Sequence, residues 1–532
     1  MSGLEHLSGA ALRREQERTL AAPRMRYSLL ARVLFRGMDL VYGRRRTLSK
    51  FKVLEREPFE SVVTADYWGF ESLADLFRQI GYDERVHKEE SLAWMATEVR
   101  MKVALIALAL LLAVPPMAPA APLAHREVLP NGIVLLVAER PAIPIVAVRV
   151  SHRAGAVFDP PDHAGLANLT GAVITRGTAK RSGPELDAAI EFVGGHLEAG
   201  AGRDGLSESL SVLKRDLGLG LDLLQEVVLT PAFPDDEVKR KIGEIQAAIQ
   251  RSEESPETVA SRALARLTFP NHPYGVPVEG TKESVGKLTR DDVVQFYRTF
   301  VRPDTTVIAV VGAVTVDEAR REVMTRFGSW PKPAAPALPP PGLPTPAPPA
   351  AETIKKELTQ ATILLGRQAI NQRNPDYFPL TVASYILGGG SASRLYSRVR
   401  EQGGLAYAVY SYLAPGRYAA SFIGSAQTRA AEVGKVSDIL SEELARMTRE
   451  RVTDRELSLA KAYLIGSFPL RLDTSAKVAD FLIAIEELGL GLDYADRYRE
   501  LIARVTADDV LRVAGQYFPP QTFNRVVVGP AP

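Results

Sequence analysis

The feature that most constrains the fold of this chain is an internal repeat. Around residue 290, a threonine and an aspartate three residues later begin a helix-like segment, which leads to an apolar run at 307–311 and a glycine. The same order recurs at the end of the chain, and the matching pairs, each 217 residues apart, are Thr289 and Thr506, Asp292 and Asp509, and Gly312 and Gly529. Threonine and an acidic residue at this spacing form a capping box. The repeat therefore predicts two related domains, each ending in a capped helix and a closing strand.

Strand-like and helix-like segments alternate within each copy. Residues 126–138 form an apolar run interrupted by Asn131 and Gly132, a hairpin turn signal, and residues 145–150 read as a buried strand. Helical apolar spacing follows in three segments, 183–193, 216–229 and 235–250. We therefore predict an α+β fold with two homologous domains, each a mainly antiparallel sheet with helices on one face.

A proline-rich segment separates the two copies. Between Trp330 and Ala350, proline stands at positions 331, 333, 336, 339, 340, 341, 344, 346, 348 and 349. This density favours an extended polyproline spacer over a packed element. We predict an N-terminal domain at 125–329, a linker at 330–351 and a C-terminal domain at 352–530.

Composition limits the chemistry of the chain. The 65 basic residues nearly balance the 63 acidic ones, so charge does not indicate a nucleic-acid partner. The chain has no cysteine, which excludes disulfides, thiolate zinc sites and cysteine nucleophiles. With seven histidines, a metal site could be built in very few places.

Residues 101–121 have the layout of a secretory signal peptide. Lys102 precedes an apolar core at 103–114, and small residues up to Ala120 form the expected cleavage site. One interpretation is that Met101 is the true start and residues 1–100 are an upstream extension. The alternative is that the uncharged stretch 103–124 is a signal anchor, the only case in which we expect membrane attachment. Both interpretations predict an extracytoplasmic protein, such as a periplasmic one.

Residues 1–100 carry one chemical signal. Glu84 and His87 are three residues apart on a predicted helix, which is half of the pattern used by di-iron bundles. Such sites need a second pair and further glutamates, so we interpret these residues as an exposed helical face. We expect the segment to contribute nothing to the main function.

Several motifs from residue 125 to 530 carry a resemblance to a known family. They are the segments 131–132, 154–156, 165–178, 249–256, 269–275, 387–390 and 404–407, in this order. Together they resemble the insulinase and pitrilysin family of metallopeptidases, which includes the mitochondrial processing peptidases. The resemblance implies the two-domain α+β fold and peptide substrates.

The resemblance also shows what this chain lacks. Active members carry an inverted zinc motif, His-x-x-Glu-His, on a helix between Gly-Leu-Ala and Gly-Thr. Here the positions of the two histidines and the glutamate read Asn168, Ala172 and Gly171, and the position of the third ligand, a glutamate, falls on Ala248. None of these side chains can serve as a zinc ligand or as a general base. We therefore expect neither metal nor another cofactor in this chain.

Other residues could in principle replace the lost ligands. His163 precedes the motif helix, His196 lies where the family has a substrate-binding edge strand, and Glu244 lies one turn before Ala248. A site built from these three would need unrelated geometry, so we interpret them as surface residues. His272 we interpret as a loop residue.

One functional pair of the family is present. The resemblance implies that an arginine and a tyrosine seven residues apart reach the zinc site from the C-terminal domain, and Arg400 and Tyr407 match them. Such side chains can hold a substrate carbonyl and donate to an oxyanion. Alternatively, Arg400 lies on a solvated helix face and Tyr407 fills the start of a strand. A weaker candidate for substrate binding is the glycine run at Gly388, Gly389 and Gly390, which also fits a plain turn.

Three functional hypotheses follow. The first is a non-catalytic subunit of an extracytoplasmic zinc peptidase heterodimer, in which a catalytic homologue holds the zinc and this chain supplies Arg400 and Tyr407 for peptide hydrolysis. The second is a structural or binding scaffold with the peptidase fold and no role in proteolysis. The third, an independent peptidase, ranks last.

Overall fold

The structure is a computed structural model that describes residues 123–530. A six-stranded sheet forms the N-terminal domain, in the order β1-β2-β6-β3-β5-β4. Its strands are β1 (His125–Val128), β2 (Val134–Glu139), β3 (Ile145–His152), β4 (His196–Ala201), β5 (Leu206–Leu213) and β6 (Thr306–Gly312). All neighbours are antiparallel except β2 and β6. The strand β4 is one edge of this sheet.

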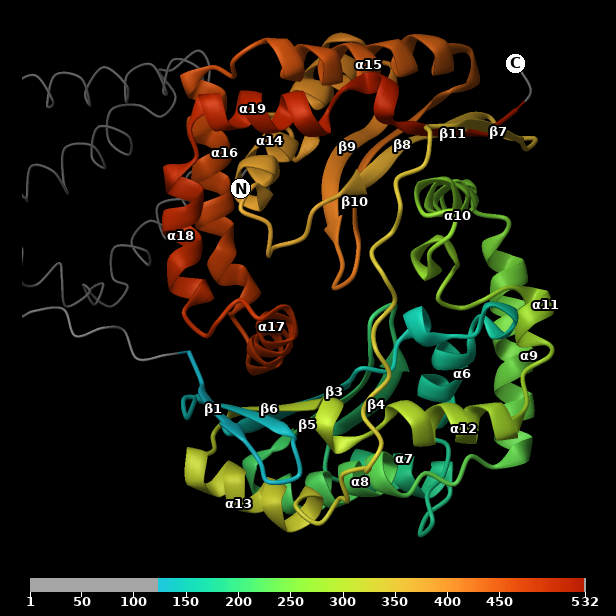
Figure 1. Cartoon of the computed structure of the whole chain (residues 1–532), viewed down its shortest axis with the longest axis vertical. Helices are drawn as coiled ribbons and strands as arrows, with labels where there is room; N and C mark the ends of the chain where they lie inside the picture. The colour runs from blue at the N-terminus through green and yellow to red at the C-terminus, as the bar shows by residue number, and fades with distance from the viewer. Residues whose placement is uncertain (1–122, 531–532) are drawn as a thin grey trace, which may run out of the picture. The chain divides into compact units, whose positions relative to one another are not determined.

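A five-stranded sheet forms the C-terminal domain and repeats the same plan. Its order is β7-β11-β8-β10-β9, and only β7 and β11 are parallel. The strands are β7 (Ala351–Lys355), β8 (Gln360–Ala369), β9 (Ala406–Pro415), β10 (Ala420–Arg429) and β11 (Asn524–Gly529). Each strand therefore corresponds to one of β2 to β6, and β9 takes the edge position of β4. This confirms the predicted α+β class with two homologous, mainly antiparallel domains (Figure 1).

Helices complete the two domains. Those of the N-terminal domain are α6 (Leu166–Val173), α7 (Gly183–Phe192), α8 (Leu217–Leu229), α9 (Asp235–Ser252), α10 (Pro256–Thr268), α11 (Lys282–Val285), α12 (Arg290–Phe300) and α13 (Val316–Phe327). Those of the C-terminal domain are α14 (Tyr377–Gly388), α15 (Val433–Arg449), α16 (Asp454–Ser467), α17 (Ser475–Leu488), α18 (Tyr494–Arg504) and α19 (Ala507–Tyr517). A π-helix, η6, spans Tyr396–Gln402.

The two predicted capping boxes begin equivalent helices, α12 and α19. The side chain of Thr289 accepts from the backbone N–H of Asp292, whose carboxylate in turn accepts from the Thr289 N–H at 2.8 Å. Thr506 and Asp509 repeat both contacts, with 2.9 Å for the second one. Each box satisfies donors that a helix start leaves without a partner. The predicted register of the repeat is therefore confirmed at the level of individual hydrogen bonds.

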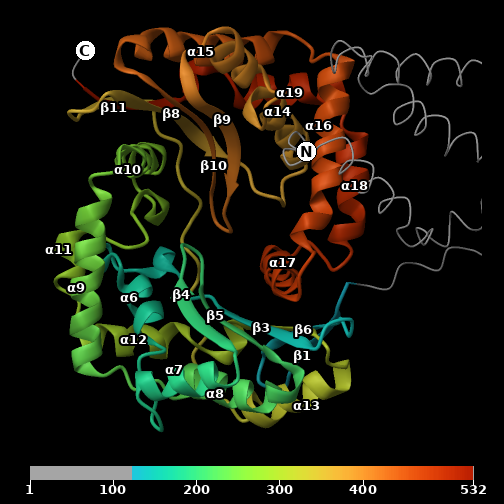
Figure 2. The same ribbon diagram turned by 180° about the vertical axis from the view of Figure 1, so that it is seen from behind.

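The two domains exchange one helix. Helix α10 of the N-terminal domain packs on β8 and β11 of the second sheet, and its counterpart α17 packs on β3 and β6 of the first (Figures 1 and 2). The reason lies in β6, whose alternate residues Val307, Ala309 and Val311 join the α17 core while Ile308 and Val310 face the other way. A strand buried on both faces reads as a continuous apolar run. The exchange makes the two cores interdependent.

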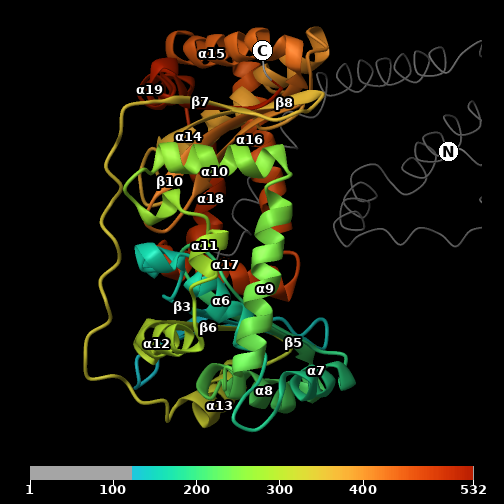
Figure 3. The same ribbon diagram turned by 90° about the vertical axis from the view of Figure 1, so that its right-hand side faces the viewer.

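The proline-rich segment follows α13 and reaches β7 as an extended chain without helix or strand (Figure 3). Within residues 123–530, no helix is long and apolar enough to cross a membrane. The predicted signal sequence at 101–121 and the pair Glu84 and His87 lie outside the described residues, as does the alternative anchor at 103–124 apart from its last two residues.

Candidate functional site

Helix α6 carries the remnant of the metal motif. Its N-terminus follows Gly165, which has a φ of 99°, a conformation that favours glycine. Because glycine offers no side chain as a cap, the carboxylate of Asp159 takes this role. Its oxygens accept from the N–H groups of Gly165 and Ala167, both at 2.9 Å. The helix is thus fixed in place although its metal ligands are missing.

At Gly171, the position of the missing glutamate, there is no room for a side chain. Gly171 is buried against the edge strand, and a Cβ atom there would lie 2.5 Å from the backbone nitrogen of Ala201 and 2.7 Å from the carbonyl carbon of Gly200. Asn168 and Ala172 are half-buried on the same helix, and Ala248 is exposed on α9. A catalytic glutamate at position 171 would displace strand β4. The residues present therefore do not fit a zinc ion, in their chemistry or in their packing.

A polar pocket of about 660 Å³ opens beside Ala172, between α6, β4, β5 and α9. Two cations line it, Arg176 and Lys241. Arg176 pairs with Asp187 at 3.1 Å, and Lys241 pairs with Glu244 at 2.7 Å. Each cation is therefore paired with a carboxylate, although Lys241 shares Glu244 with Arg240.

The three replacement candidates are engaged elsewhere. The Nδ1 atom of His163 lies 3.0 Å from the carboxylate of Asp162, and this interaction raises the pKa of His163, which favours a protonated ring that cannot bind metal. His196 pairs with Glu198 at 2.8 Å on the edge strand. Across residues 123–530, no three His, Cys, Asp or Glu side chains gather in a group that could hold a metal ion. The structure does not bring His163, His196 and Glu244 into one site.

Arg400 and Tyr407 lie together on the surface of the C-terminal domain. The guanidinium carbon of Arg400 is 5.4 Å from the centre of the Tyr407 ring and 5.1 Å from that of Tyr396. Tyr407 is the second residue of β9 and is 75% exposed, and Arg400 is exposed on η6, a placement that fits the alternative interpretation as well as the functional one. Cation–π contacts with two rings orient the arginine side chain. Within the described part of the chain, neither its guanidinium nor the Tyr407 hydroxyl has a hydrogen bond.

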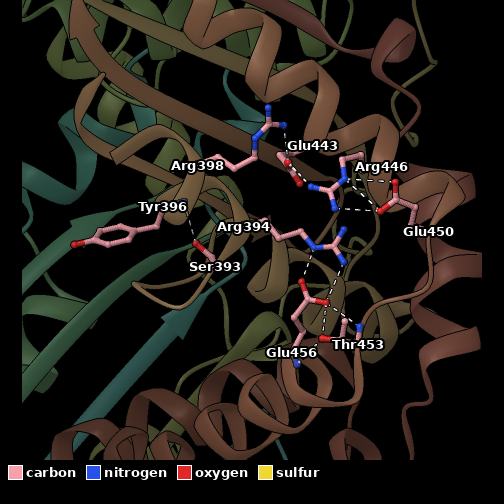
Figure 4. Close-up of polar contacts among 9 residues, drawn as sticks. All are labelled: Ser393, Arg394, Tyr396, Arg398, Glu443, Arg446, Glu450, Thr453 and Glu456. Atoms are coloured by element: carbon pink, nitrogen blue, oxygen red, sulfur yellow. Dashed lines mark hydrogen bonds and ion pairs between the residues drawn. The ribbon is translucent and has the colours of Figure 1, made fainter. Parts of the chain in front are cut away.

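The π-helix that carries Arg400 is anchored by ion pairs (Figure 4). Just before it, Arg394 donates two hydrogen bonds to Glu456 at the start of α16, at 2.6 and 3.1 Å. One turn later, Arg398 donates to Glu443 of α15 at 2.7 Å, and Glu443 also accepts from Arg446 at 2.8 Å. Figure 4 shows Tyr396 pointing away from these pairs. The side chains of Arg394 and Arg398 therefore attach this segment to α16 and α15, whereas Tyr396 points away from these ion pairs and Arg400 is exposed.

The carboxylate of Glu456 is held in its ionised form. Burial opposes ionisation of Glu456, but hydrogen bonds from Arg394 and from the N–H of Thr453 outweigh it and lower the pKa of Glu456. The Glu443 side chain has no exposed surface and relies on its two arginines. Such a network resists bending of the π-helix, an irregular element that is frequent at functional sites.

The glycine run has a packing role. Gly388 ends α14, and a Cβ there would lie 2.5 Å from the backbone nitrogen of Ser411. A Cβ on Gly389 would lie 2.5 Å from the Tyr385 ring, and one on Gly390 would lie 3.0 Å from the Tyr385 hydroxyl. Close packing accounts for the first two glycines. A substrate contact by this run stays a prediction.

Three tyrosines of η6 and β9, Tyr396, Tyr410 and Tyr412, were not predicted as site residues from the sequence. Tyr410 and Tyr412 stack on the open face of β9 with ring centres 6.0 Å apart, beside a cavity of about 420 Å³ between α10 and the second sheet. Tyr410 and Tyr412 stand two residues apart on a strand, which places both side chains on one face, so their spacing in the sequence could have identified them. Tyr396 lies four residues before Arg400, the helical spacing that brings side chains together.

Comparisons with known proteins agree with this geometry. Two α+β domains, with a metal-motif helix in the first, define the class of insulinase-like metallopeptidase homologues. A family model described as "Insulinase (Peptidase family M16)" matches residues 134–282, and one described as "Peptidase M16 inactive domain" matches 287–464. The chain belongs to the insulinase family, peptidase family M16.

Individual relatives cover most of the chain. An uncharacterized zinc protease of Streptomyces coelicolor is 30% identical over 73% of this chain and 86% of its own length. One of Bacillus subtilis is 28% identical over 65% of this chain and 83% of its own length. A solved peptidase M16 inactive domain from Pseudomonas fluorescens has a TM-score of 0.73 and 26% identity, covering 77% of this chain and 98% of that one. A protease from Helicobacter pylori, at a TM-score of 0.73 and 19% identity, covers 77% and 100% and supports the fold.

Proposed function

We propose that this chain is the non-catalytic subunit of an insulinase-like zinc peptidase heterodimer. The observation that carries the proposal is the contrast between two sites. The motif helix has lost its ligands and has closed on strand β4 at Gly171, whereas Arg400 and Tyr407 remain together, exposed and anchored. Arg400 and Tyr407 are exposed, and neither makes a hydrogen bond within the described residues. We therefore infer that this pair completes the active site of another chain.

The partner in this proposal is a catalytic homologue with an intact zinc motif, and the substrate is a peptide. Zinc in that partner would polarise the scissile carbonyl and activate the attacking water. From this chain, the Tyr407 hydroxyl would donate to the oxyanion, and the fork of Arg400 would hold a neighbouring substrate carbonyl. Location outside the cytoplasm is part of the same proposal and rests on the predicted signal sequence.

Reconstitution with the catalytic homologue tests the proposal. Tyr407→Phe keeps the ring that stacks on Arg400 and removes the hydroxyl, so assembly should survive while peptide hydrolysis falls on the order of a hundredfold, as for the loss of one oxyanion donor. Arg400→Lys keeps the charge but loses the planar fork and should also reduce hydrolysis. Tyr463→Phe, at an exposed tyrosine of α16 outside the candidate site, is the matched control and should hydrolyse peptide at the wild-type rate.

Size-exclusion chromatography establishes whether each variant assembles. If Tyr407→Phe and Arg400→Lys both assemble and cleave like the wild type, the pair has no catalytic role. The scaffold hypothesis, a peptidase fold without proteolysis, would then replace the proposal.

A further inference from the structure

A trough runs between α10 and the open face of the second sheet. Helix α10 packs on β8 and β11 and leaves the same face of β9 and β10 open beside it (Figure 1). The space between them is the cavity of about 420 Å³, a volume within the range of small-ligand sites. Tyr410 and Tyr412 of β9 form one wall of this trough, and α10 forms the other.

The floor of the trough carries hydroxyl groups. Ser421, Ile423 and Ser425 alternate on β10 and therefore face the same side, and Thr362 lies on this side of the neighbouring strand β8. The side chains of Ser425 and Thr362 are 4% and 3% exposed. Across residues 123–530, none of the three hydroxyls makes a hydrogen bond. They can donate to and accept from the peptide groups of a ligand.

A carboxylate without a cationic partner marks one end of the trough. Glu257 lies in the first turn of α10 and is exposed. It accepts from the side-chain amide of Gln427 at 2.6 Å and from the hydroxyl of Ser255 at 3.0 Å, and both donors are neutral. No ion pair in the described part of the chain includes Glu257. Its negative charge is therefore available to a cationic group of a ligand.

A guanidinium without an anionic partner marks the other end. The guanidinium carbon of Arg203 lies 4.8 Å from the centre of the Tyr274 ring, which packs on Phe269, just past the end of α10. The carboxylate of Asp204 is already engaged, because it accepts from the Tyr274 hydroxyl and from the backbone N–H of Arg417. Within 123–530, Arg203 itself has neither a hydrogen bond nor an ion pair. Its N–H groups can therefore bind an anionic group.

The two charges are separated by about the length of the helix. Helix α10 has 13 residues, which is about 20 Å at the usual rise. Both charged side chains line the trough and reach into it, which shortens the distance that a ligand has to span. An extended peptide of four or five residues spans up to about 14 to 18 Å. A peptide of this length carries an ammonium group at one end and a carboxylate at the other.

We propose that the trough binds short peptides of about four or five residues by both free ends, with the ammonium group at Glu257 and the carboxylate at Arg203. The hydroxyls of the floor bind the peptide groups, and Tyr410 and Tyr412 contact the side chains of the peptide. Free ends of this kind are what peptide hydrolysis produces, so the ligands are products of such a reaction. The site belongs to this chain alone and needs neither zinc nor a partner.

Equilibrium dialysis of the full-length chain, without any partner, tests the trough. The probe is a mixture of tetrapeptides and pentapeptides of varied sequence in three forms: with both ends free, without the α-amino group, and with the carboxylate replaced by an amide. Mass spectrometry of the retained peptides measures the preference among the forms. A hydrogen bond to a charged group is worth about tenfold or more in affinity, so free peptides should bind at least that much more tightly than either altered form.

Two variants assign each end of the peptide to one residue. Glu257→Gln removes the charge and keeps the size, so it should bind peptides with and without the α-amino group equally while still discriminating against the amides. Arg203→Gln should show the opposite pattern. Glu254→Gln and Arg251→Gln, at exposed positions outside the trough, are the matched controls and should keep both preferences of the wild type.

The proposal would be overturned if the wild type retained no peptide or retained the three forms alike. It would also fail if Glu257→Gln changed the affinity for all three forms by the same factor, because a residue that only shapes the trough acts in this way. If Arg203→Gln does not fold, the wild type and Glu257→Gln still decide. None of these measurements involves a zinc-containing partner, so their outcome is separate from that of the heterodimer proposal.

Discussion

Gly171→Ala should destabilise the protein, although alanine is the better residue inside a helix. Glycine in a helix interior costs about 1 kcal/mol relative to alanine, so the substitution alone would add about that much stability. At Gly171, however, the new Cβ would lie 2.5 Å from the nitrogen of Ala201 and 2.7 Å from the carbonyl carbon of Gly200. Both neighbours are backbone atoms of the edge strand, which cannot rotate away as a side chain can.

The magnitude follows from the distances. Atoms in ordinary contact are about 3.5 Å apart, so α6 and β4 must separate by roughly 1 Å. Overpacking of this kind typically costs about 1–3 kcal/mol. After the gain in helix propensity, we expect a net loss of up to about 2 kcal/mol in the free energy of unfolding.

Gly243 supplies the matched control because it also lies inside a helix, α9, with no atom within 4 Å of its Cβ position. Gly243→Ala should therefore gain up to about 1 kcal/mol. Urea unfolding of the two variants and the wild type measures the difference between them, which should be about 1–3 kcal/mol. If Gly171→Ala is stabilised as much as Gly243→Ala, helix α6 is not closed on β4 and the packing argument against the zinc site fails.

Three further predictions concern metal, processing and the anchor of the π-helix. The purified chain should hold no stoichiometric zinc. Restoring the motif by Asn168→His, Gly171→Glu, Ala172→His and Ala248→Glu should not create a tight zinc site, because a glutamate at position 171 displaces β4. Metal analysis or calorimetry that finds one zinc bound per chain, in the wild type or in this variant, would contradict these expectations. The mature protein should begin near Ala121 outside the cytoplasm, and N-terminal sequencing that finds residues 1–100 on a cytoplasmic protein would contradict this. Arg398→Ala leaves the buried Glu443 with Arg446 alone and should cost about 1–3 kcal/mol in urea unfolding, whereas Arg429→Ala, which removes an exposed pair, should leave the midpoint unchanged.

Much of the fold could be predicted because the repeat and the capping boxes are local signals. Thr289 with Asp292 fixes the start of α12 through contacts three residues apart, and Thr506 with Asp509 does the same for α19. Apolar alternation and the turn at Gly132 likewise identify the first strands. These signals are formed by residues close together in the sequence, so they can be recognised from the sequence alone.

Other features depend on contacts between distant segments and leave no local signal. The exchange of α10 and α17 is an example, since both helices read as ordinary amphipathic helices wherever they pack. The π-helix of Arg400 is another, because ion pairs to Glu443 and Glu456, more than forty residues away, hold it. The proline-rich segment 330–350 is predicted as an extended spacer, and its hydrogen bonds to Arg153 and Arg302 cannot be read from its own composition.

The structure also changes which residues can indicate function. Gly165 and the loop from Phe269 to Gly275 belong to the motifs that carry the family resemblance, yet both have packing roles, at the start of α6 and in a small core with Val157 and Ala419. A chain without catalysis would keep them for the fold alone, so they do not distinguish a catalytic subunit from a scaffold. Arg400 and Tyr407 are different, because both are exposed and a scaffold gains little from their cation–π contact at the surface. The choice between the two functional hypotheses therefore depends on this pair, and Tyr407→Phe, which removes one hydroxyl without disturbing a core, is the substitution that separates them.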